Sequence, residues 1–352
     1  MSALLEVDNL TVALPTRGGY RNAVDDLSLT VGLGEVVGIA GESGSGKTMT
    51  ALSLFGLLPN GARVTGSARL DGTDLLALRG RQLRAVRGRQ VAMVSQDPSA
   101  SLHPILTIGT QLTEHMRHHL GVSKSEANTR AAQLLDTVRI PDPERALGSY
   151  PGQFSGGMRQ RIAIAVALAA EPRLLVADEP TTALDVTVQA GILRLLDRLC
   201  RERDLSVIVI THDLGVMSAL ARRVYVMYAG RLAEAGATAQ LLTRPRHPYT
   251  RGLLDALPHP EAGHAALVPI GGTPPSLGAV PGGCPFHPRC RYAVASCSVS
   301  RPEAVPAGAD YVSADYVSAG MISAGDAGRT DASGPDAGHL LACPPDPLRE
   351  LS

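Results

Sequence analysis

The sequence lacks both an excess of charge and a long apolar run. Thirty-three basic residues balance 33 acidic ones, so no net charge draws the chain towards nucleic acid or anionic lipid. The longest apolar run, residues 162–170, is about half of the roughly 20 residues that a membrane-spanning helix requires. The N-terminal residues alternate between apolar and polar and lack the basic start and apolar core of a signal peptide. We therefore expect a protein that stays in the cytosol and does not itself cross a bilayer.

Aromatic residues are also scarce, at 3% of the sequence, which leaves few side chains on which nucleic-acid bases could stack. A basic run between residues 79 and 89 is the feature that would favour nucleic acid. It consists of Arg79, Arg81, Arg84, Arg87 and Arg89. Because the net charge is zero, we interpret the run as a solvated face or a local contact with a partner subunit, and we expect no nucleic-acid partner.

From residue 4 to about 255, apolar strand-like runs alternate with helical patterns, and Gly or Pro marks the joints. This alternation is typical of an α/β fold. Between residues 98 and 151 the pattern is polar and helical, which predicts a helical insertion at about 97–165. We assign residues 1–257 to one α/β domain. Its predicted strands are residues 35–40, 90–95, 174–178 and 206–211, of which the last three are nearly continuous apolar runs, as buried parallel strands should be.

The amino-acid composition changes after residue 258. GGTPPSLGAVPGG, residues 271–283, is rich in glycine and proline and predicts a linker or an extended strap. Farther on, DYVSA occurs twice in tandem over residues 310–319, and Gly, Ser, Ala and Asp then dominate. Because such a stretch buries too little apolar surface to order itself, we expect disorder at about 303–340. Residues 258–352 are assigned to an irregular, cysteine-containing extension.

The segment GESGSGKT, residues 41–48, matches G-x-x-x-x-G-K-[ST] and lies between an apolar strand and a helical run. Glycines let successive backbone N–H groups point at phosphate oxygens, and the helix N-terminus adds a partial positive charge. A chance glycine-rich turn is the alternative, but the flanking strand and helix argue against it. The segment therefore predicts an ATP and Mg²⁺ site. Its expected contributors are Gly41, Ser43, Gly44, Ser45, Gly46 and Lys47 for the phosphates and Thr48 for Mg²⁺.

Two adjacent carboxylates follow an apolar run later in the chain. LLVADEP places Asp178 and Glu179 at the end of a predicted strand, where they can reach the phosphate edge of the sheet. Taken alone, an acidic pair after a strand is more often a helix cap or a solvated turn. With the phosphate loop upstream, we expect Asp178 to hold Mg²⁺ and Glu179 to orient or deprotonate the attacking water.

The segment FSGGM, residues 154–158, resembles the signature motif of ABC ATPases. Ser155, Gly156 and Gly157 open a predicted helix, whose free N–H groups and positive dipole end suit a γ-phosphate. The resemblance implies that two cassettes pack head to tail, so that the signature of one closes over ATP held by the phosphate loop of the other. It also implies the ABC-type P-loop fold: a RecA-like α/β core, an antiparallel β subdomain and a helical subdomain that carries the signature.

Further motifs follow in the order of that family. Gln96 in VSQDP resembles the Q-loop glutamine, which contacts Mg²⁺ and water and links to membrane subunits. Asp185 in TTALD resembles the D-loop at the dimer interface, and His212 in VITHD resembles the switch histidine that contacts the γ-phosphate. Tyr20 is a candidate aromatic for stacking on adenine, although an exposed loop tyrosine is almost as common. The resemblance thus implies Glu179, His212 and Gln96 as catalytic residues.

Longer segments narrow the resemblance. QDPSASLHP, YPGQFSGGMRQR, HPYTRGLLDALP and GTPPSLGAVPGGCPFHPRC are similar to ATP-binding subunits of dipeptide and oligopeptide importers, a group that includes nickel importers. The resemblance implies a peripheral ATPase at the cytoplasmic face of the membrane. Its implied partners are two transmembrane permease subunits, a second homologous ATP-binding subunit and an extracytoplasmic solute-binding protein.

The transported substrate is not encoded in this chain, so peptide and nickel both stay open. Two other functions would use the same ATP site. A soluble ABC ATPase of repair or translation usually carries a second cassette or long coiled-coil arms, and neither is present in the sequence. A regulatory protein that uses ATP as a slow switch would be distinguished by its low rate of hydrolysis.

The cysteines are unevenly placed. Cys200 stands alone on a helical run and is expected to be a buried core thiol. The other four lie in the last quarter of the chain, and their spacing is wider than the two to four residues usual for zinc pairs. The resemblance implies a four-iron four-sulfur cluster, with structural zinc and free thiols as alternatives, and the long gap before the last cysteine departs from the family pattern. The four candidate ligands are Cys284, Cys290, Cys297 and Cys343.

Overall fold

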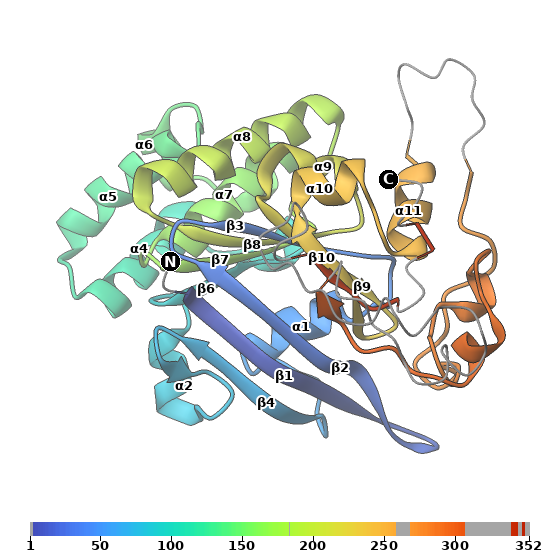
Figure 1. Cartoon of the computed structure of the whole chain (residues 1–352). Coiled ribbons are helices and arrows are strands. Elements are labelled where there is room, and N and C mark those ends of the chain that lie inside the picture. The colour runs from blue at the N-terminus through green and yellow to red at the C-terminus, as the bar shows by residue number, and fades with distance from the viewer. Residues whose placement is uncertain (1–2, 183, 258–267, 307–338, 344–346, 349–352) are drawn as a thin grey trace.

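The computed structural model describes residues 3–182, 184–257, 268–306, 339–343 and 347–348. Within these ranges the chain forms a large mixed sheet, a smaller antiparallel sheet, and helices around them (Figure 1). No helix in this part of the chain is both long and apolar enough to cross a bilayer.

The large sheet has the strand order β11-β12-β10-β9-β3-β8-β7-β6. Strands β9, β3, β8, β7 and β6 run parallel to one another. β10 pairs antiparallel with β9, and β12 and β11 continue the antiparallel pairing. All four strands predicted from the sequence exist, with ends that differ by at most one residue. The bounds are β3 Val36–Ala40, β6 Val91–Val94, β7 Leu174–Asp178, β8 Ser206–Thr211, β9 Arg223–Tyr228, β10 Arg231–Ala237, β11 Val305–Pro306 and β12 Leu340–Leu341.

The large sheet is buried on both faces because its strands are apolar at nearly every position. In β8, Val207 and Val209 pack into one apolar core, while Ile208 and Ile210 pack into the other, as the two-residue period of a strand requires. Helices cover the first face, and α1 with the antiparallel sheet covers the second (Figure 1). These helices are α1 Lys47–Leu54, α7 Gly156–Leu168, α8 Val186–Arg203 and α9 Leu214–Leu220.

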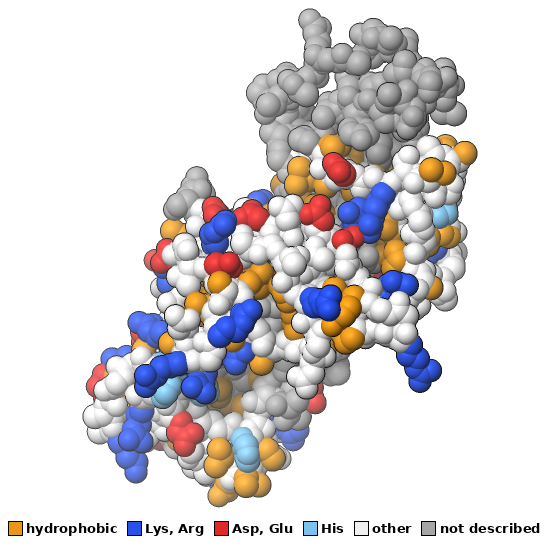
Figure 2. Space-filling view, turned by 90° about the horizontal axis from the view of Figure 1, so that it is seen from below, with side chains coloured by type: hydrophobic (Ala, Val, Ile, Leu, Met, Phe, Trp, Pro, Cys, Tyr) orange, Lys and Arg blue, Asp and Glu red, His pale blue; other side chains and the backbone are white. Residues whose placement is uncertain are grey.

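The antiparallel sheet has the order β2-β1-β4-β5. Its bounds are β1 Ala3–Thr16, β2 Gly19–Gly32, β4 Arg63–Leu70 and β5 Thr73–Asp74, and it leads into α2 Gly80–Val86. On this side of the molecule, basic and acidic side chains lie interspersed with apolar ones (Figure 2). The basic run is partly structural, because Arg87 donates to the carbonyl of Phe55, and Arg89 donates to those of Ala170 and Glu171.

A helical segment is inserted between β6 and β7. Side-chain oxygens of Thr107, Ser123, Asp142 and Ser155 accept hydrogen bonds from backbone N–H groups at the starts of their helices, as N-cap residues do. The first of these helices ends at Gly121, whose φ of 67° is left-handed. The helices are α3 Pro98–Ser101, α4 Ile108–Leu120, α5 Lys124–Thr137, α6 Pro143–Leu147, the 3₁₀ turn η1 Pro151–Gln153, and then α7.

The C-terminal extension packs onto the end of the large sheet. Phe286 contacts Tyr228 of β9 and Tyr249 of helix α11 (Pro248–Asp255), with ring centroids 5.2 and 5.3 Å away, respectively. The segment expected to be disordered, 303–340, contains ordered strands at both of its ends. There, β11 pairs with β12, and β12 pairs with β10. Residues 307–338 lie outside the described residues. The remaining elements are α10 Thr238–Thr243, α11 Pro248–Asp255, η3 His287–Arg289 and η4 Ala295–Ser298.

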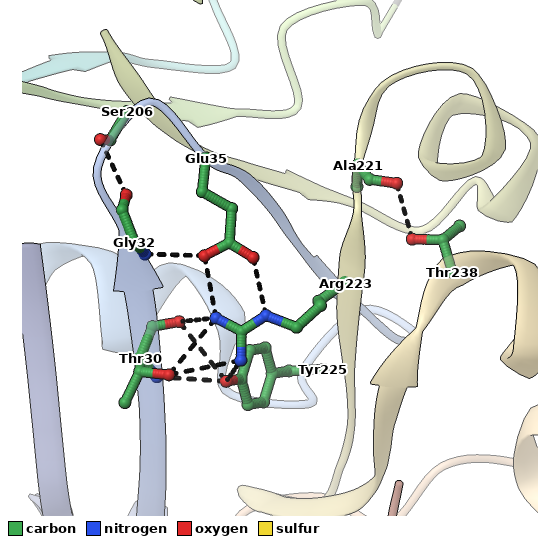
Figure 3. A network of polar contacts seen from close by, with 8 residues as sticks. All are labelled: Thr30, Gly32, Glu35, Ser206, Ala221, Arg223, Tyr225 and Thr238. Atoms are coloured by element: carbon green, nitrogen blue, oxygen red, sulfur yellow. Dashed lines mark hydrogen bonds and ion pairs between the residues drawn. The ribbon is translucent and has the colours of Figure 1, made fainter. Parts of the chain in front are cut away.

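A polar network ties the two sheets together (Figure 3). Arg223 of β9 donates to both carboxylate oxygens of Glu35, at 2.7 and 2.9 Å, and to the carbonyl of Thr30 in β2, at 3.0 Å. Glu35 also accepts from the backbone of Gly32 at 2.7 Å. Burial alone would raise the pKa of Glu35, but the hydrogen bonds from Arg223 and Gly32 and the charge of Arg223 bring it below the usual value.

Replacing Arg223 with alanine is expected to destabilise the fold by about 1–2 kcal/mol at pH 7, because it leaves a half-buried carboxylate without its charged partner. Since the pKa of Glu35 is lower in the folded protein, its contribution is present above the unfolded pKa of about 4.3 and is lost as the pH falls through the folded pKa. Urea unfolding at pH 7 and at acid pH measures both effects. Arg69→Ala, which removes an exposed pair with Asp8, is the control and should change stability by less than about 0.5 kcal/mol. An equal effect of the two variants at pH 7 would contradict this account.

Candidate active site

The phosphate loop connects β3 to α1, as the sequence predicted. Its backbone needs glycine at two positions where the chain approaches closely. Gly41 has a φ of 147°, and a Cβ there would lie 2.3 Å from the carbonyl oxygen of Met227; Gly46 has a φ of 104°, and its Cβ would lie 2.6 Å from that of Ala23. These contacts fix the loop against β9 and β2 and leave its N–H groups at the start of α1 available for an anion.

Lys47 is the first residue of α1 and is 5% exposed. Its ammonium donates to the carbonyls of Gly41 and Glu42 at 2.6 and 2.9 Å, so the loop itself accepts two of its hydrogen bonds. Burial lowers the pKa of Lys47, whereas the carboxylates of Glu179, Asp178 and Glu42 act in the opposite direction. A compact cation with negative neighbours, placed under a curled loop, can meet the oxygens of a polyphosphate.

Asp178 ends β7 and is 5% exposed. Burial raises its pKa, although a hydrogen bond from the Thr48 hydroxyl and the charge of Lys47 act against this rise. Strand β7 is the second strand along from β3 in the sheet, so the end of β7 and the start of α1 meet at one edge. The pairing of a carboxylate with a threonine hydroxyl provides oxygen ligands of the kind that Mg²⁺ prefers.

Glu179 is the point where the predicted catalytic residues meet. Its carboxylate accepts hydrogen bonds from Gln96 Nε2 at 3.0 Å and Thr182 Oγ1 at 2.8 Å, and one oxygen lies 3.1 Å from His212 Nδ1. Burial would raise the pKa of Glu179, but the hydrogen bonds from Thr182 and His212 and nearby positive charge lower it. The residue is therefore ionised at neutral pH and can orient a water molecule by accepting its hydrogen bonds. For Thr182 the sequence offers no signal beyond its place three residues after Glu179.

Other predicted site residues do not join this group within the chain. Ser155 caps α7 and accepts from Met158 N–H at 3.4 Å, and Asp185 caps α8 and accepts from Val188 N–H at 2.9 Å. The first turn of α7, with Gly156 and Gly157, is held close to α8: a Cβ on Gly157 would lie 2.6 Å from Val188 Cγ1. Ser155 and Gly156 are exposed, as a surface that meets another molecule would be. Their contact with a nucleotide stays a prediction.

Tyr20 also lies apart. Its ring is covered by the guanidinium of Arg63, 3.8 Å from the ring centroid, and it is not among the described residues that line the pocket over the phosphate loop. Its role in adenine binding stays a prediction. Residues 274–277 of the C-terminal extension do line that pocket, which the sequence did not signal. The described lining residues are Ala23, Ser43, Gly44, Ser45, Gly46, Lys47, Thr48, Met49, Gln96, Glu179, Pro274, Pro275, Ser276 and Leu277.

The four C-terminal cysteines lie near one another. Burial, with added contributions from neighbouring thiols of the set, raises the pKa of Cys284, Cys290 and Cys343. The N–H of Cys284 donates to the carbonyl of Cys297 at 2.8 Å. Across the described ranges, no three or more His, Cys, Asp or Glu side chains are grouped so as to hold a single metal ion. Cys200 is buried in the core, where burial raises its pKa to about 12.

This arrangement defines a class of protein. A phosphate loop between a parallel strand and a helix, with an ionised glutamate held beside it by residues from other strand ends, is the site of a P-loop nucleoside triphosphatase.

Comparison with known proteins gives the family. Residues 24–182 match the model of the ABC transporter family, and residues 233–297 match that of the oligopeptide/dipeptide transporter C-terminal region. The chain is 47% identical to the oligopeptide transport ATP-binding protein OppD of Salmonella typhimurium over 86% of this chain and 90% of that protein. It is 48% identical to the dipeptide transport ATP-binding protein DppD of Bacillus subtilis over 84% of this chain and 89% of that protein.

A dimeric bacterial ABC transporter cassette has the same fold, with a TM-score of 0.60, 28% identity, and coverage of 66% of this chain and 98% of that one. A post-hydrolysis dimeric cassette bound to ADP and phosphate matches with a TM-score of 0.59 and 29% identity. The chain belongs to the ABC transporter ATPases, in the group of oligopeptide and dipeptide transport ATP-binding proteins. The fold and the family predicted from the sequence are thereby confirmed.

Proposed function

We propose that this chain is the ATP-hydrolysing subunit of an importer that moves peptides across the cytoplasmic membrane. The observation that carries the proposal is the meeting of Gln96, Thr182 and His212 at the carboxylate of Glu179, beside Lys47. Two curated relatives, named for oligopeptide and dipeptide transport, cover most of the chain and support the substrate class.

The proposed division of labour follows the geometry. Lys47 and the loop N–H groups hold the phosphates, and Thr48, Gln96 and Asp178 supply oxygens for Mg²⁺, which when bound neutralises phosphate charge. Glu179 accepts a hydrogen bond from the attacking water, and His212, whose Nδ1 lies 3.1 Å from the Glu179 carboxylate, contacts the γ-phosphate. Ser155, Gly156 and Gly157 of a second cassette close the site in a head-to-tail dimer, since the exposed start of α7 has no phosphate partner within its own described chain. Asp185 then lies at the dimer interface.

The proposed partners are two permease subunits, a second ATP-binding subunit and an extracytoplasmic solute-binding protein, with this chain at the cytoplasmic face. Reconstitution of the cognate permeases with both ATP-binding subunits in lipid vesicles tests whether these proteins form a working peptide importer. Peptide-loaded binding protein is expected to stimulate ATP hydrolysis and uptake of labelled peptide. Stimulation by nickel-loaded binding protein, with no response to peptide, would overturn the substrate class. Full stimulation of ATP hydrolysis by nucleic acid, without vesicles or permeases, would overturn the transport function.

We also propose that Cys284, Cys290, Cys297 and Cys343 hold a four-iron four-sulfur cluster. The N–H of Cys284 donates to the carbonyl of Cys297 at 2.8 Å, which brings two of these residues together, and the resemblance of the four-cysteine pattern to the family supports a shared site. A single tetrahedral zinc ion requires sulfur atoms about 3.8 Å apart, whereas a cluster bridges thiols that are farther apart. Among the described side chains, no group of three or more His, Cys, Asp or Glu is placed to hold a metal ion, so the proposal rests on the number and pattern of these cysteines. A bound cluster would order this short segment.

Anaerobic purification tests the cluster proposal. The wild-type chain is expected to be brown and to contain about four iron and four sulfide per chain. Cys343→Ser should lower the iron content, whereas Cys200→Ala, which changes the core thiol, should not. A colourless protein with zinc, or with no metal, would contradict the proposal.

A further inference from the structure

Arg289, which lies between Cys284 and Cys290 in the C-terminal extension, forms an ion pair with the phosphate loop. Arg289 donates to both carboxylate oxygens of Glu42, at 2.7 and 3.0 Å, although the two residues are 247 positions apart. Glu42 is the second residue of the phosphate loop, and the Arg289 side chain is only 5% exposed. A bidentate pair of this kind fixes both position and orientation. The C-terminal extension therefore holds the loop that is expected to bind phosphate.

Aromatic residues that pack around this ion pair also hold the phosphate loop in place. The N–H of Glu42 donates to the hydroxyl of Tyr249 at 2.7 Å. Tyr249 is fully buried, and its ring packs against Tyr228 and Phe286, the latter three residues before Arg289. The Tyr228 hydroxyl also lies 3.2 Å from Arg289. Both the backbone and the side chain of Glu42 are thus held from the C-terminal side of the chain.

The same arginine positions the strap over the site. Arg289 Nε donates to the carbonyl of Gly271 at 2.8 Å. At Gly272, where φ is 70°, the chain turns so closely that a Cβ would lie 3.3 Å from Arg289 Cγ. The strap then continues to residues 274–277, which face the phosphate loop across the pocket. One side chain therefore connects the loop to the wall opposite it.

We propose that the C-terminal extension is a working part of the ATP site: Arg289 neutralises and positions Glu42, and residues 274–277 form a wall against the bound nucleotide. The electrostatic argument is direct. An unpaired Glu42 carboxylate in the phosphate loop would repel a triphosphate, and in a partly buried site this repulsion is poorly screened. This inference rests on the proposed nucleotide site and adds to it a dependence on residues far away in the sequence.

The test is binding of Mg²⁺ with a hydrolysis-resistant ATP analogue to the full chain, measured by calorimetry. Arg289→Gln is expected to weaken binding about tenfold. Glu42→Gln alone should bind at least as tightly as the wild type, and the double variant with both changes should bind within about threefold of Glu42→Gln. Recovery in the double variant identifies charge as the cause, because a merely misfolded extension would not be rescued by a second substitution. Replacing Pro274 and Pro275 with glycine should weaken binding severalfold by loosening the wall.

Two controls separate the possible failures. Arg291→Gln makes the same charge change two residues away, at a side chain that is 61% exposed, and should leave affinity unchanged. Lys47→Ala reports on the nucleotide site itself: if it binds as tightly as the wild type, the proposed site is wrong, whereas loss in Lys47→Ala without loss in Arg289→Gln refutes only the role of the extension. A double variant no better than Arg289→Gln would overturn the electrostatic role. Tighter binding after the proline substitutions would mean that the strap competes with nucleotide, and would overturn its role as a wall.

Discussion

Glu179→Gln is expected to bind ATP with nearly wild-type affinity and to hydrolyse it at least roughly 100-fold more slowly. The substitution keeps the size of the side chain and can retain contacts with Thr182 and Gln96, but it removes the carboxylate that accepts a hydrogen bond or a proton from water. Loss of a positioned base commonly costs about 10²–10⁴ in rate. Steady-state phosphate release and equilibrium nucleotide binding measure the two quantities separately.

The control for this variant is Glu171→Gln. Glu171 is also acidic, but its side chain is 56% exposed and pairs with Arg130 at the surface, so its neutralisation should leave hydrolysis unchanged. Unchanged turnover in Glu179→Gln would refute the assignment. Because hydrogen bonds lower the pKa of Glu179 below its ordinary value of 4.5, protonation of this carboxyl should not slow hydrolysis until the pH falls below about 4.5.

The sequence predicted best those parts of the site that are local. The phosphate loop spans residues 41–48, and the contacts of Lys47 are made to carbonyls five and six positions away. The buried strands are also predictable from the sequence, because an uninterrupted apolar run indicates a strand that is buried on both faces of the sheet. Gln96 and His212 lie 83 and 33 positions from Glu179, and their roles came from the resemblance to a family and not from periodicity or spacing.

The contacts that the sequence did not reveal are single long-range complementarities. Nothing near Glu42 or Arg289 indicates that these two charges pair, because one carboxylate and one guanidinium make no pattern along the chain. The sequence predicts a solvated face or a partner contact for the basic run, yet Arg87 and Arg89 donate to backbone carbonyls elsewhere in the fold. The average composition of residues 303–340 also gives no indication of β11 and β12, because strands of two residues hardly change the mean hydropathy of a long polar stretch.

Lys47→Ala is expected to lower ATP affinity by at least roughly 100-fold. The buried ammonium donates to two carbonyls of its own loop and lies near the carboxylates of Asp178 and Glu179. Without it, those negative charges face the triphosphate, and a charged hydrogen bond of about 1.5–3 kcal/mol is lost as well. Adenosine, which carries no phosphate, should lose far less affinity than ATP, and titration of both ligands measures the difference.

The chain provides its own control, because Lys124 is the other lysine in the sequence and is exposed on α5. Lys124→Ala should bind ATP as the wild type does. Lys47→Arg should also fail to restore binding, since the planar guanidinium is larger than the ammonium and cannot occupy a position that is 5% exposed without displacing the loop. A chain with 33 basic residues but only two lysines thus places one of them where a small, buried point charge is required. Wild-type affinity in Lys47→Arg would show that net charge alone holds the triphosphate, and that the close fit of the loop around the ammonium is unimportant.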